Sequence, residues 1–190
     1  MEKVILLSAS PRKDSNCELV LNECRKVIES EGLEAKILTL KGKHIRACVA
    51  CNMCVDLKRC VYNDDGVNEI IEELKSAKGF IVATPVYFGA ARGDLMCALQ
   101  RIGYVSRRLE NNILSWMVGG PIAVGRRGGL TTTYSELLMF YLMNDMIVPG
   151  STYWNIVFGV KQGDVLNDIE GIETVKRFSA NVSQVIKKIL

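Results

Sequence analysis

Short apolar runs alternate along this chain with longer segments in which apolar residues recur at helical intervals. The runs 4–7 and 79–84 are almost entirely apolar, as expected of strands that are buried on both faces of a parallel sheet. In the longer segments, apolar residues lie three or four positions apart, which is typical of helices with one buried face. This alternation favours a parallel α/β sheet with helices on both sides.

The pattern predicts five strands, at residues 4–7, 35–40, 79–84, within 113–124 and within 146–160. It predicts helices that begin near Ser15, at Asp64 or Asp65 and around residue 92, followed by helices at 130–143 and at the C-terminus. Five strands suit the flavodoxin-like, doubly wound α/β fold, in which the ligand lies beyond the carboxyl ends of the first and third strands. The loops after Leu7 and Ala83 are therefore the first candidates for a binding site, and Pro85 is expected to end the third strand.

The chain has the size and charge of one ordinary domain. Its 190 residues contain no evident linker, so we expect a single domain at 1–190, interrupted by a cysteine-rich insertion at about 44–63. A formal net charge of +3 does not single out nucleic acid or an anionic membrane as a partner. The apolar run at the N-terminus is too short for a signal peptide, and no stretch reaches the ~18 apolar residues of a membrane span. We therefore expect a cytoplasmic protein.

Four of the seven cysteines lie within thirteen residues, with the spacing Cys48-x2-Cys51-x2-Cys54-x5-Cys60. Iron–sulfur clusters take four thiolates, and repeated C-x2-C steps let a short loop wrap a cube. The alternative is structural zinc, which usually uses two C-x2-C pairs with a longer spacer. Three cysteines at consecutive steps crowd one side of a tetrahedral ion, so the spacing favours a [4Fe–4S] cluster over zinc. The remaining cysteines, Cys17, Cys24 and Cys97, are expected in the core.

The loop at residues 8–16 connects the first strand to a helix that begins with the capping-box spacing Ser15-x-x-Glu18. Free backbone N–H groups and the helix dipole favour an anion at such a point. The hydroxyls of Ser8, Ser10 and Ser15 and the side-chain amide of Asn16 add donors, and Arg12 can hold a phosphate through two parallel hydrogen bonds. Neither a Rossmann nor a Walker glycine motif is present. The alternative interpretation is a solvated polar loop with an N-cap.

Two further loops follow predicted strands. Residues 84–89 offer the apolar side chains Val86, Tyr87 and Phe88 as an edge for a flat ring. The glycine pairs between 119 and 129 allow close backbone approach, which suits the polar edge of an isoalloxazine. Arg126 or Arg127 is placed to stabilise a reduced, anionic flavin. Each loop alone is also explained by turn chemistry, but three at the ends of successive strands favour a binding site.

These residues resemble a known family. Ser10-Pro11-Arg12-Lys13-x-Ser15-Asn16 looks like the FMN-phosphate loop of the NADPH-dependent FMN reductase superfamily, and Pro85-Val86-Tyr87 resembles its flavin-ring loop. The four-cysteine set is similar to that of the archaeal iron–sulfur flavoproteins. The resemblance implies FMN and one [4Fe–4S] cluster per subunit, in a homodimer or homotetramer. The positions that it implies for FMN are Ser8, Ser10, Arg12, Ser15, Asn16, Cys17, Pro85, Val86, Tyr87, Phe88, Gly89, Arg127, Gly128 and Gly129; those for the cluster are Cys48, Cys51, Cys54 and Cys60.

The resemblance also implies an activity. Relatives of this kind are flavin-dependent, electron-transfer oxidoreductases that pass electrons from ferredoxin or a similar donor through the cluster to FMN, and on to an acceptor such as O2, H2O2 or a quinone. No acid–base catalyst is nominated, because the cofactors carry the chemistry. Many relatives have Thr where this chain has Cys17. Two alternatives stay open: an NAD(P)H-dependent FMN or quinone reductase with a structural metal in the cysteine loop, and a redox sensor.

Overall fold

A computed structural model describes residues 1–189, and its centre is a parallel sheet. The strands are β1 (Lys3–Ser8), β2 (Glu34–Thr39), β3 (Ala77–Tyr87), β5 (Val118–Gly125) and β6 (Ile156–Phe158). They lie in the order β2-β1-β3-β5-β6, while the two-residue β4 (Ala90–Ala91) pairs antiparallel with the end of β3. This order is that of flavodoxin-like, doubly wound sheets. The predicted fold class is therefore confirmed.

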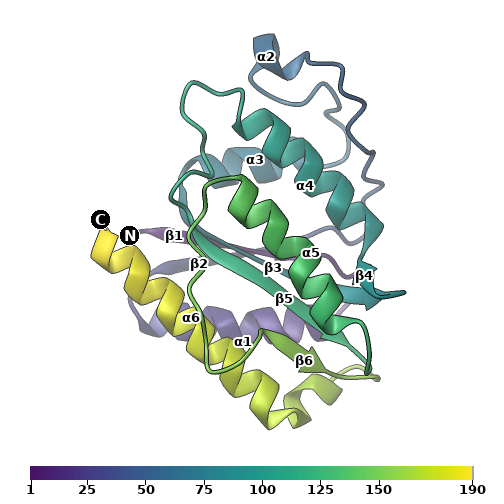
Figure 1. The fold of residues 1–190 in the computed structure, drawn as a ribbon, viewed down its shortest axis with the longest axis vertical. Helices are drawn as coiled ribbons and strands as arrows, with labels where there is room; N and C mark the ends of the chain where they lie inside the picture. Colours follow the sequence, from purple (N-terminus) through teal and green to yellow (C-terminus); the bar gives the residue numbers. More distant parts are fainter. Residues whose placement is uncertain (190) are drawn as a thin grey trace.

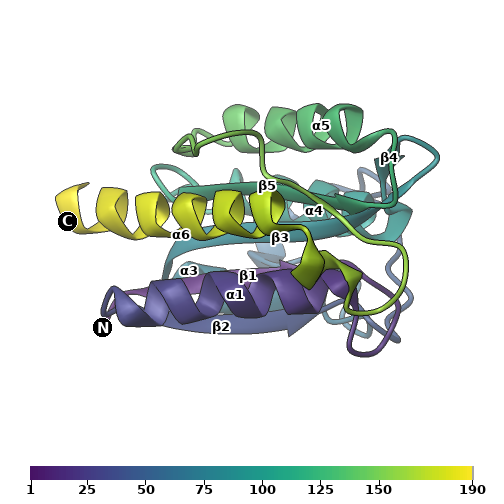
Figure 2. The ribbon, with the colours of Figure 1, turned by 90° about the horizontal axis from the view of Figure 1, so that it is seen from below.

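Helices cover both faces of the sheet (Figures 1 and 2). On one face lie α1 (Asn16–Ser30) and α6 (Ile169–Ile189), with the short 3-10 helix η1 (Asp164–Asn167) before α6. On the other face lie α3 (Val67–Lys75), α4 (Gly93–Ser106) and α5 (Leu130–Met143). Because side chains alternate along β1, Leu6 packs toward α1 and α6, whereas Leu7 packs toward α3 and α4. Two separate apolar cores result.

The apolar run in β1 is explained by its central place in the sheet. Leu7 of β1 pairs with Leu38 of β2 on one side and with Val82 of β3 on the other. Residues 4–8 are fully buried because helices cover both faces. β2 lies at the edge of the sheet, where its side chains are partly exposed, and its sequence is correspondingly mixed.

The beginning of α1 matches the expectation from the sequence. Ser15 is the N-cap, and its hydroxyl accepts a hydrogen bond of 3.3 Å from the backbone N–H of Glu18. The backbone N–H of Ser15 donates in return to Glu18 Oε2 at 3.2 Å. The reciprocal bonds of the capping box are both present, so the chain turns sharply from the loop after β1 into the helix.

Two features of the strands differ from the expectation. β3 does not end at Pro85 but continues to Tyr87. A residue other than proline at position 85 would point its N–H toward β1. β1 has already ended at Ser8, and the last hydrogen bond between the two strands joins Ala9 N to Ala83 O. Pro85 is therefore tolerated, because no partner strand needs its missing N–H. Gly119 lies inside β5 rather than in a loop, and so does the following glycine. A Cβ at Gly119 would lie 1.8 Å from the carbonyl oxygen of Phe80, so glycine is needed for close strand packing.

The cysteine-rich insertion lies between β2 and α3 and contains one helical turn, α2 (Cys54–Leu57). Ile45 and Cys54 of this segment pack into the core under α3 and α4. The expected cap of α3 at Asp64 or Asp65 is wrong: Gly66 is the N-cap, at φ +85°. Asp65 still accepts a hydrogen bond from Val67 N at 3.3 Å, but its carboxylate also pairs with Arg101.

None of the helices within residues 1–189 combines the length and the apolar character needed to cross a membrane.

Candidate functional site

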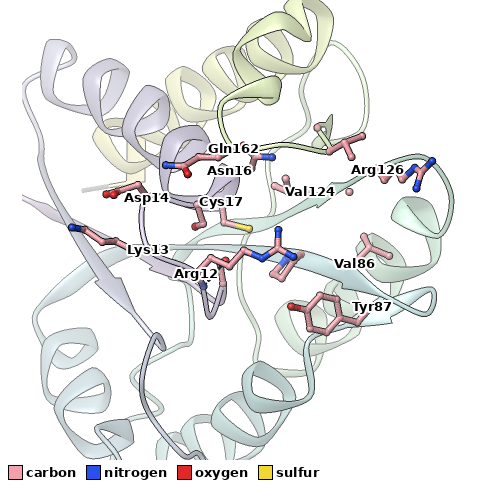
Figure 3. Close-up of a pocket in the computed structure, with 16 residues that line it drawn as sticks. Arg12, Lys13, Asp14, Asn16, Cys17, Val86, Tyr87, Val124, Arg126 and Gln162 are labelled. Carbon is pink, nitrogen blue, oxygen red and sulfur yellow. Dashed lines mark hydrogen bonds between the residues drawn. The ribbon is translucent and has the colours of Figure 1, made fainter.

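A pocket of about 270 Å³ opens at the carboxyl ends of β1, β3 and β5, as expected for this fold. Four segments line it: the loop after β1, the end of β3, the end of β5 and the loop after β6. In Figure 3, Lys13 and Arg126 lie at opposite ends of the pocket, with Arg12 between them. The segments that sequence analysis singled out after the first and third strands thus meet in one place.

The structure sorts the predicted FMN-binding residues into two groups. Those that line the pocket are Ser10, Arg12, Ser15, Asn16, Cys17, Pro85, Val86 and Tyr87. Those that do not line it are Ser8, Phe88, Gly89, Arg127, Gly128 and Gly129. The first group comes from two segments, the loop after β1 with the start of α1 and the end of β3. Together they bring basic, polar and apolar side chains to one cavity. The second group has other roles in the fold, or lies at the rim.

One end of the pocket is built to hold an anion. The backbone N–H groups of Asn16 and Cys17, in the first turn of α1, have no acceptor in the part of the chain from 1 to 189. Arg12 and Lys13 line the same pocket, and the guanidinium of Arg12 points into it (Figure 3). Ser10 shapes the loop, since its Oγ accepts from Arg12 N at 3.3 Å. Free N–H groups, a helix N-terminus and two cations together suit a phosphate group.

Cys17 lies at the anion end of the pocket and is almost fully buried. Burial raises the pKa of its thiol far above the usual value, and the neighbouring carboxylate of Glu18 adds to the shift. The side chain is therefore a neutral thiol at physiological pH and does not repel a bound anion. Its backbone N–H supplies the same donor that a threonine at this position would supply.

Asn16 lines the pocket, but its side chain serves the neighbouring loop. Nδ2 donates to the carbonyl oxygen of Lys161 at 2.9 Å, and Oδ1 accepts from Gly163 N at 2.9 Å. Both ends of the amide are thus taken by the loop after β6. The expectation of a side-chain contact to phosphate is replaced by a role in positioning that loop, while the Asn16 backbone N–H stays free for an anion.

The other end of the pocket is apolar and has a basic side chain at its edge. Val86 and Tyr87 at the end of β3 lie beside Val124 of the neighbouring β5 and Arg126, which follows β5, and all four line the pocket (Figure 3). A flat ring would find apolar contacts on one side and a cation at its edge. Arg126 lines the pocket, whereas Arg127, which the resemblance implied as an FMN-binding position, does not.

Glycines beside the pocket hold two loops together. A Cβ at Gly129, which has φ +81°, would lie 2.7 Å from the Cα of Gly89. Thr132 Oγ1 donates to the carbonyl oxygens of both glycines, at 2.7 Å and 2.9 Å. Phe88, which precedes Gly89, is fully exposed, at φ +52°. Gly89 and Gly129 therefore fix the rim.

Ser8 is also outside the pocket. It is fully buried at the end of β1, and its hydroxyl has no hydrogen-bond partner among the described residues. Sequence reasoning missed the loop after β6, which contributes Gly159, Val160 and Gln162. That loop follows a strand of only three residues, so its position at the pocket had no recognisable signal.

The four clustered cysteines line a second, much smaller pocket of about 20 Å³. Its opposite wall is formed by Arg101, Tyr104 and Val105 of α4. Within residues 1–189, no three His, Cys, Asp or Glu side chains are arranged to hold a single metal ion. The cysteine sulfurs thus face one pocket without forming the tight shell of a one-ion site.

The cysteine loop is held in an unusual backbone conformation. Ala50, Asn52 and Lys58 have positive φ values of 51°, 57° and 55°, which cost energy for residues other than glycine. Asn68 of α3 fixes the end of the loop, since its side chain bonds both Cys60 N at 2.9 Å and Cys60 O at 3.0 Å. Backbone strain retained by surrounding contacts is common at functional sites.

Burial also affects the thiols of the loop. Cys54 is the most buried of the four, and burial raises its pKa, an effect partly offset by the nearby charge of Arg108. Cys51 is exposed, whereas Cys48 and Cys60 are half-buried. The four thiols therefore differ in burial around one pocket, as expected of ligands that contact a bound group from several sides.

The sheet order and the pocket at its carboxyl edge define a flavodoxin-like protein. The chain belongs to the NADPH-dependent FMN reductase family, which matches residues 2–161, and is a flavin-dependent oxidoreductase. It is 37% identical over 195 residues to an iron–sulfur flavoprotein of Methanocaldococcus jannaschii, with 98% of both chains covered. It is 34% identical over 193 residues to an iron–sulfur flavoprotein of Archaeoglobus fulgidus, covering 93% of this chain and 95% of that one.

A solved structure agrees on the fold. A flavodoxin, WrbA-like protein of Agrobacterium tumefaciens aligns over 99% of both chains with a TM-score of 0.69. Its sequence identity to this chain is 12%, so the likeness concerns the fold alone. Together with the family match, it confirms the resemblance that the loop motifs indicated.

Proposed function

We propose that this chain is an iron–sulfur flavoprotein, a single flavodoxin-like domain at 1–190 that binds FMN and, through an insertion at about 44–63, a [4Fe–4S] cluster. The observation that carries the proposal is the presence of two distinct pockets in one fold. One has the anion and ring contacts of a flavin site, and the other is lined by all four clustered cysteines. The iron–sulfur flavoproteins at 37% and 34% identity support the same combination.

FMN fits the larger pocket by the chemistry of its two ends. The phosphate is assigned to the free N–H groups of Asn16 and Cys17, with the positive charges of Arg12 and Lys13 beside them. The ring is assigned to Val86 and Tyr87. Arg126, at the end of β5, lies where a cation would stabilise negative charge on a reduced flavin. Ser10, Ser15 and Pro85 complete the walls of the site.

A cluster fits the second pocket by its donor set. Four thiols, Cys48, Cys51, Cys54 and Cys60, line it, and a [4Fe–4S] cube takes one thiolate at each iron. A zinc ion would instead draw four sulfurs to about 2.3 Å from one centre. No three ligands in residues 1–189 are arranged in that way, and three cysteines at consecutive C-x2-C steps suit the larger group. At about 20 Å³ the pocket must widen to admit the cluster; of the four ligands, Cys51 is exposed, and Cys48 and Cys60 are half-buried.

When bound, a cluster supplies one-electron chemistry and FMN supplies one- or two-electron chemistry. We propose that electrons enter at the cysteine pocket from a one-electron donor such as reduced ferredoxin, and leave at the flavin pocket to an acceptor such as O2, H2O2 or a quinone. The side chains bind, orient and balance charge. His44, the one histidine of the sequence, is exposed and lines neither pocket, so it is not assigned as a proton donor.

We propose further that the protein acts as a homodimer or homotetramer. An apolar face runs along α4 and α5, where Met139, Leu142 and Met143 are each at least 60% exposed. Tyr104 of α4 lies in the same groove. An exposed apolar face of this kind is typical of a surface that is covered in the assembled protein.

The test of the function compares three proteins purified without oxygen: the wild type, Cys51→Ser and Cys97→Ser. Cys97→Ser is the matched control, because Cys97 lies on α4 and outside the cysteine pocket. We expect about four irons per chain in the wild type and in Cys97→Ser, and loss of iron in Cys51→Ser. Stoichiometric zinc without iron in the wild type would refute the cluster.

The donor is tested with the same proteins. Reduced ferredoxin should reduce the bound flavin in the wild type and in Cys97→Ser, and do so much more slowly in Cys51→Ser. If all three react equally with ferredoxin, or if NADPH reduces the flavin at the same rate in all of them while ferredoxin does not, the NAD(P)H-dependent reductase with a structural metal becomes the better description.

A further inference from the structure

A buried ion pair lies behind the cysteine pocket. Arg101 of α4 and Asp65, which precedes α3, have side chains that are only 1% and 3% exposed. They are the only buried charged residues in the part of the chain from 1 to 189. Arg101 Nη2 donates to Asp65 Oδ1 at 3.0 Å, and Nη1 bonds the other carboxylate oxygen. Charged side chains are rarely buried unless they are paired, and the pair here is bidentate.

The remaining donors of Arg101 point at the cysteine loop. Nη1 reaches the carbonyl oxygen of Arg46 at 3.3 Å, and Nη2 reaches that of Tyr62 at 3.0 Å. Nε donates to the Sγ of Cys60 at 3.1 Å. Each nitrogen of the guanidinium therefore has an acceptor, and one acceptor is the sulfur of a proposed cluster ligand.

Support of the cysteine loop does not by itself require a buried ion pair between Arg101 and Asp65. Burying two charges costs several kcal/mol before their attraction is counted, and apolar residues of similar volume often replace such pairs without loss of stability. An apolar side chain at 101 would fill the space between α4 and the loop, but it would leave the carbonyl oxygens of Arg46 and Tyr62 and the sulfur of Cys60 without their N–H donors. Support of the loop accounts for the bonds to the two carbonyl oxygens, whereas the bond from Nε reaches the sulfur of a proposed cluster ligand and is not needed for that support.

We propose that Arg101 is a positioning residue that raises the reduction potential of the cluster by donating Nε–H to Cys60, an inference that rests on the proposed function. On reduction the cluster accepts one electron from the external donor and its net charge falls by one, with no proton transfer. Hydrogen bonds to sulfur and nearby charge are two of the factors that set such potentials. The buried positive charge and the N–H···S bond favour the more negative, reduced state.

Asp65 has the opposite effect on the same equilibrium. Its carboxylate fixes the orientation of the Arg101 fork, but its negative charge offsets that of the guanidinium. Removal of the carboxylate charge should therefore favour reduction, whereas removal of Arg101 should oppose it. If the pair only supported the loop, substitutions of Arg101 and of Asp65 would not be expected to shift the reduction potential in opposite directions.

The test is a spectroscopic redox titration of the cluster in holoprotein, for the wild type, Arg101→Lys, Arg101→Gln and Asp65→Asn. Lysine keeps the charge and the pairing with Asp65 but lacks the Nε donor. We expect the equilibrium constant for reduction to fall about tenfold in both Arg101 variants, which is about 59 mV for one electron, and to rise in Asp65→Asn. Arg107→Gln is the matched control, because Arg107 follows α4 and is exposed, and we expect no shift.

The outcomes separate the two proposals. A wild type without a cluster overturns the proposed function itself. A wild type with a cluster, and Arg101 variants that retain both iron and the wild-type potential, overturn the role of Arg101 alone. If Arg101→Gln loses its iron, the reduction potentials of the other two variants decide. A lower potential in Arg101→Lys and a higher one in Asp65→Asn support the inference, and shifts of any other sign overturn it. Loss of the cluster from all three variants would mean that the pair only supports the loop, which also overturns the inference.

Discussion

The side chain of Asn16 offers a sharp test of how the flavin pocket is built, because it lines the pocket yet bonds the loop after β6. Asn16→Ala removes two hydrogen bonds of 2.9 Å, to Lys161 O and from Gly163 N. Each such bond contributes about 0.5–1.5 kcal/mol, and the lower half of that range applies because the bonds are partly exposed. We therefore expect a loss of about 1–2 kcal/mol in the free energy of unfolding of flavin-free protein.

For a domain of this length, that loss lowers Tm by about 2–8 °C. The measurement is thermal unfolding of the flavin-free protein, followed by circular dichroism, together with FMN titration. Gln162→Ala is the matched control, since Gln162 lies in the same loop and carries the same amide, but makes no side-chain hydrogen bond within residues 1–189. Weaker FMN binding by Asn16→Ala with an unchanged Tm would mean that the amide binds phosphate directly, and our assignment would be wrong.

Two further predictions concern the rim of the pocket and the far edge of the sheet. Gly129→Ala should destabilise the protein by about 1–3 kcal/mol in denaturant unfolding, because φ is +81° and the added Cβ would lie 2.7 Å from Gly89 Cα; Gly128→Ala, where a Cβ meets open space, should not. Hydrogen bonds from Lys36 and Lys3 lower the pKa of Glu73, so its contribution to stability is present above the usual carboxylate pKa and is lost as pH falls through the lowered value. Stability measured from pH 6 to pH 3 should therefore fall less steeply in Glu73→Gln, and equal slopes would contradict this reasoning.

The fold was predictable because burial on both faces leaves a strong signal. Residues 4–8 of β1 and 79–84 of β3 are buried, and their sequences are correspondingly almost continuous apolar runs. The N-terminus of α1 was predictable because a capping box needs two particular residues at fixed spacing. β6 was predicted only as lying somewhere in 146–160, because it has three residues and Ile147 takes a separate single bridge to Val118.

The site was predictable only where contacts are local. The loop after β1 carries its own donors, and of the residues that the resemblance implied there, Ser10, Arg12, Ser15, Asn16 and Cys17 all line the pocket. The choice between Arg126 and Arg127 depends on how β5 ends, which a run of glycines and arginines does not reveal. The role of Asn16 depends on residues about 145 positions away, and no local pattern encodes such a partner.

Helix α4 connects the two pockets and explains why they lie where they do. At its N-cap, Arg92 Nη1 donates to Ala9 O at 3.0 Å, and Arg92 N donates to Thr84 Oγ1 at 3.2 Å, so this end is tied to the loops of the flavin pocket. Nine residues later, Arg101 donates to Cys60 Sγ. At about 1.5 Å per residue, these two positions lie roughly 13 Å apart along the helix axis. Because a helix is stiff, this spacing is set by α4 rather than by the exposed cysteine loop, and the bonds of Arg101 to Cys60 Sγ and to the carbonyl oxygens of Arg46 and Tyr62 join the loop to the helix.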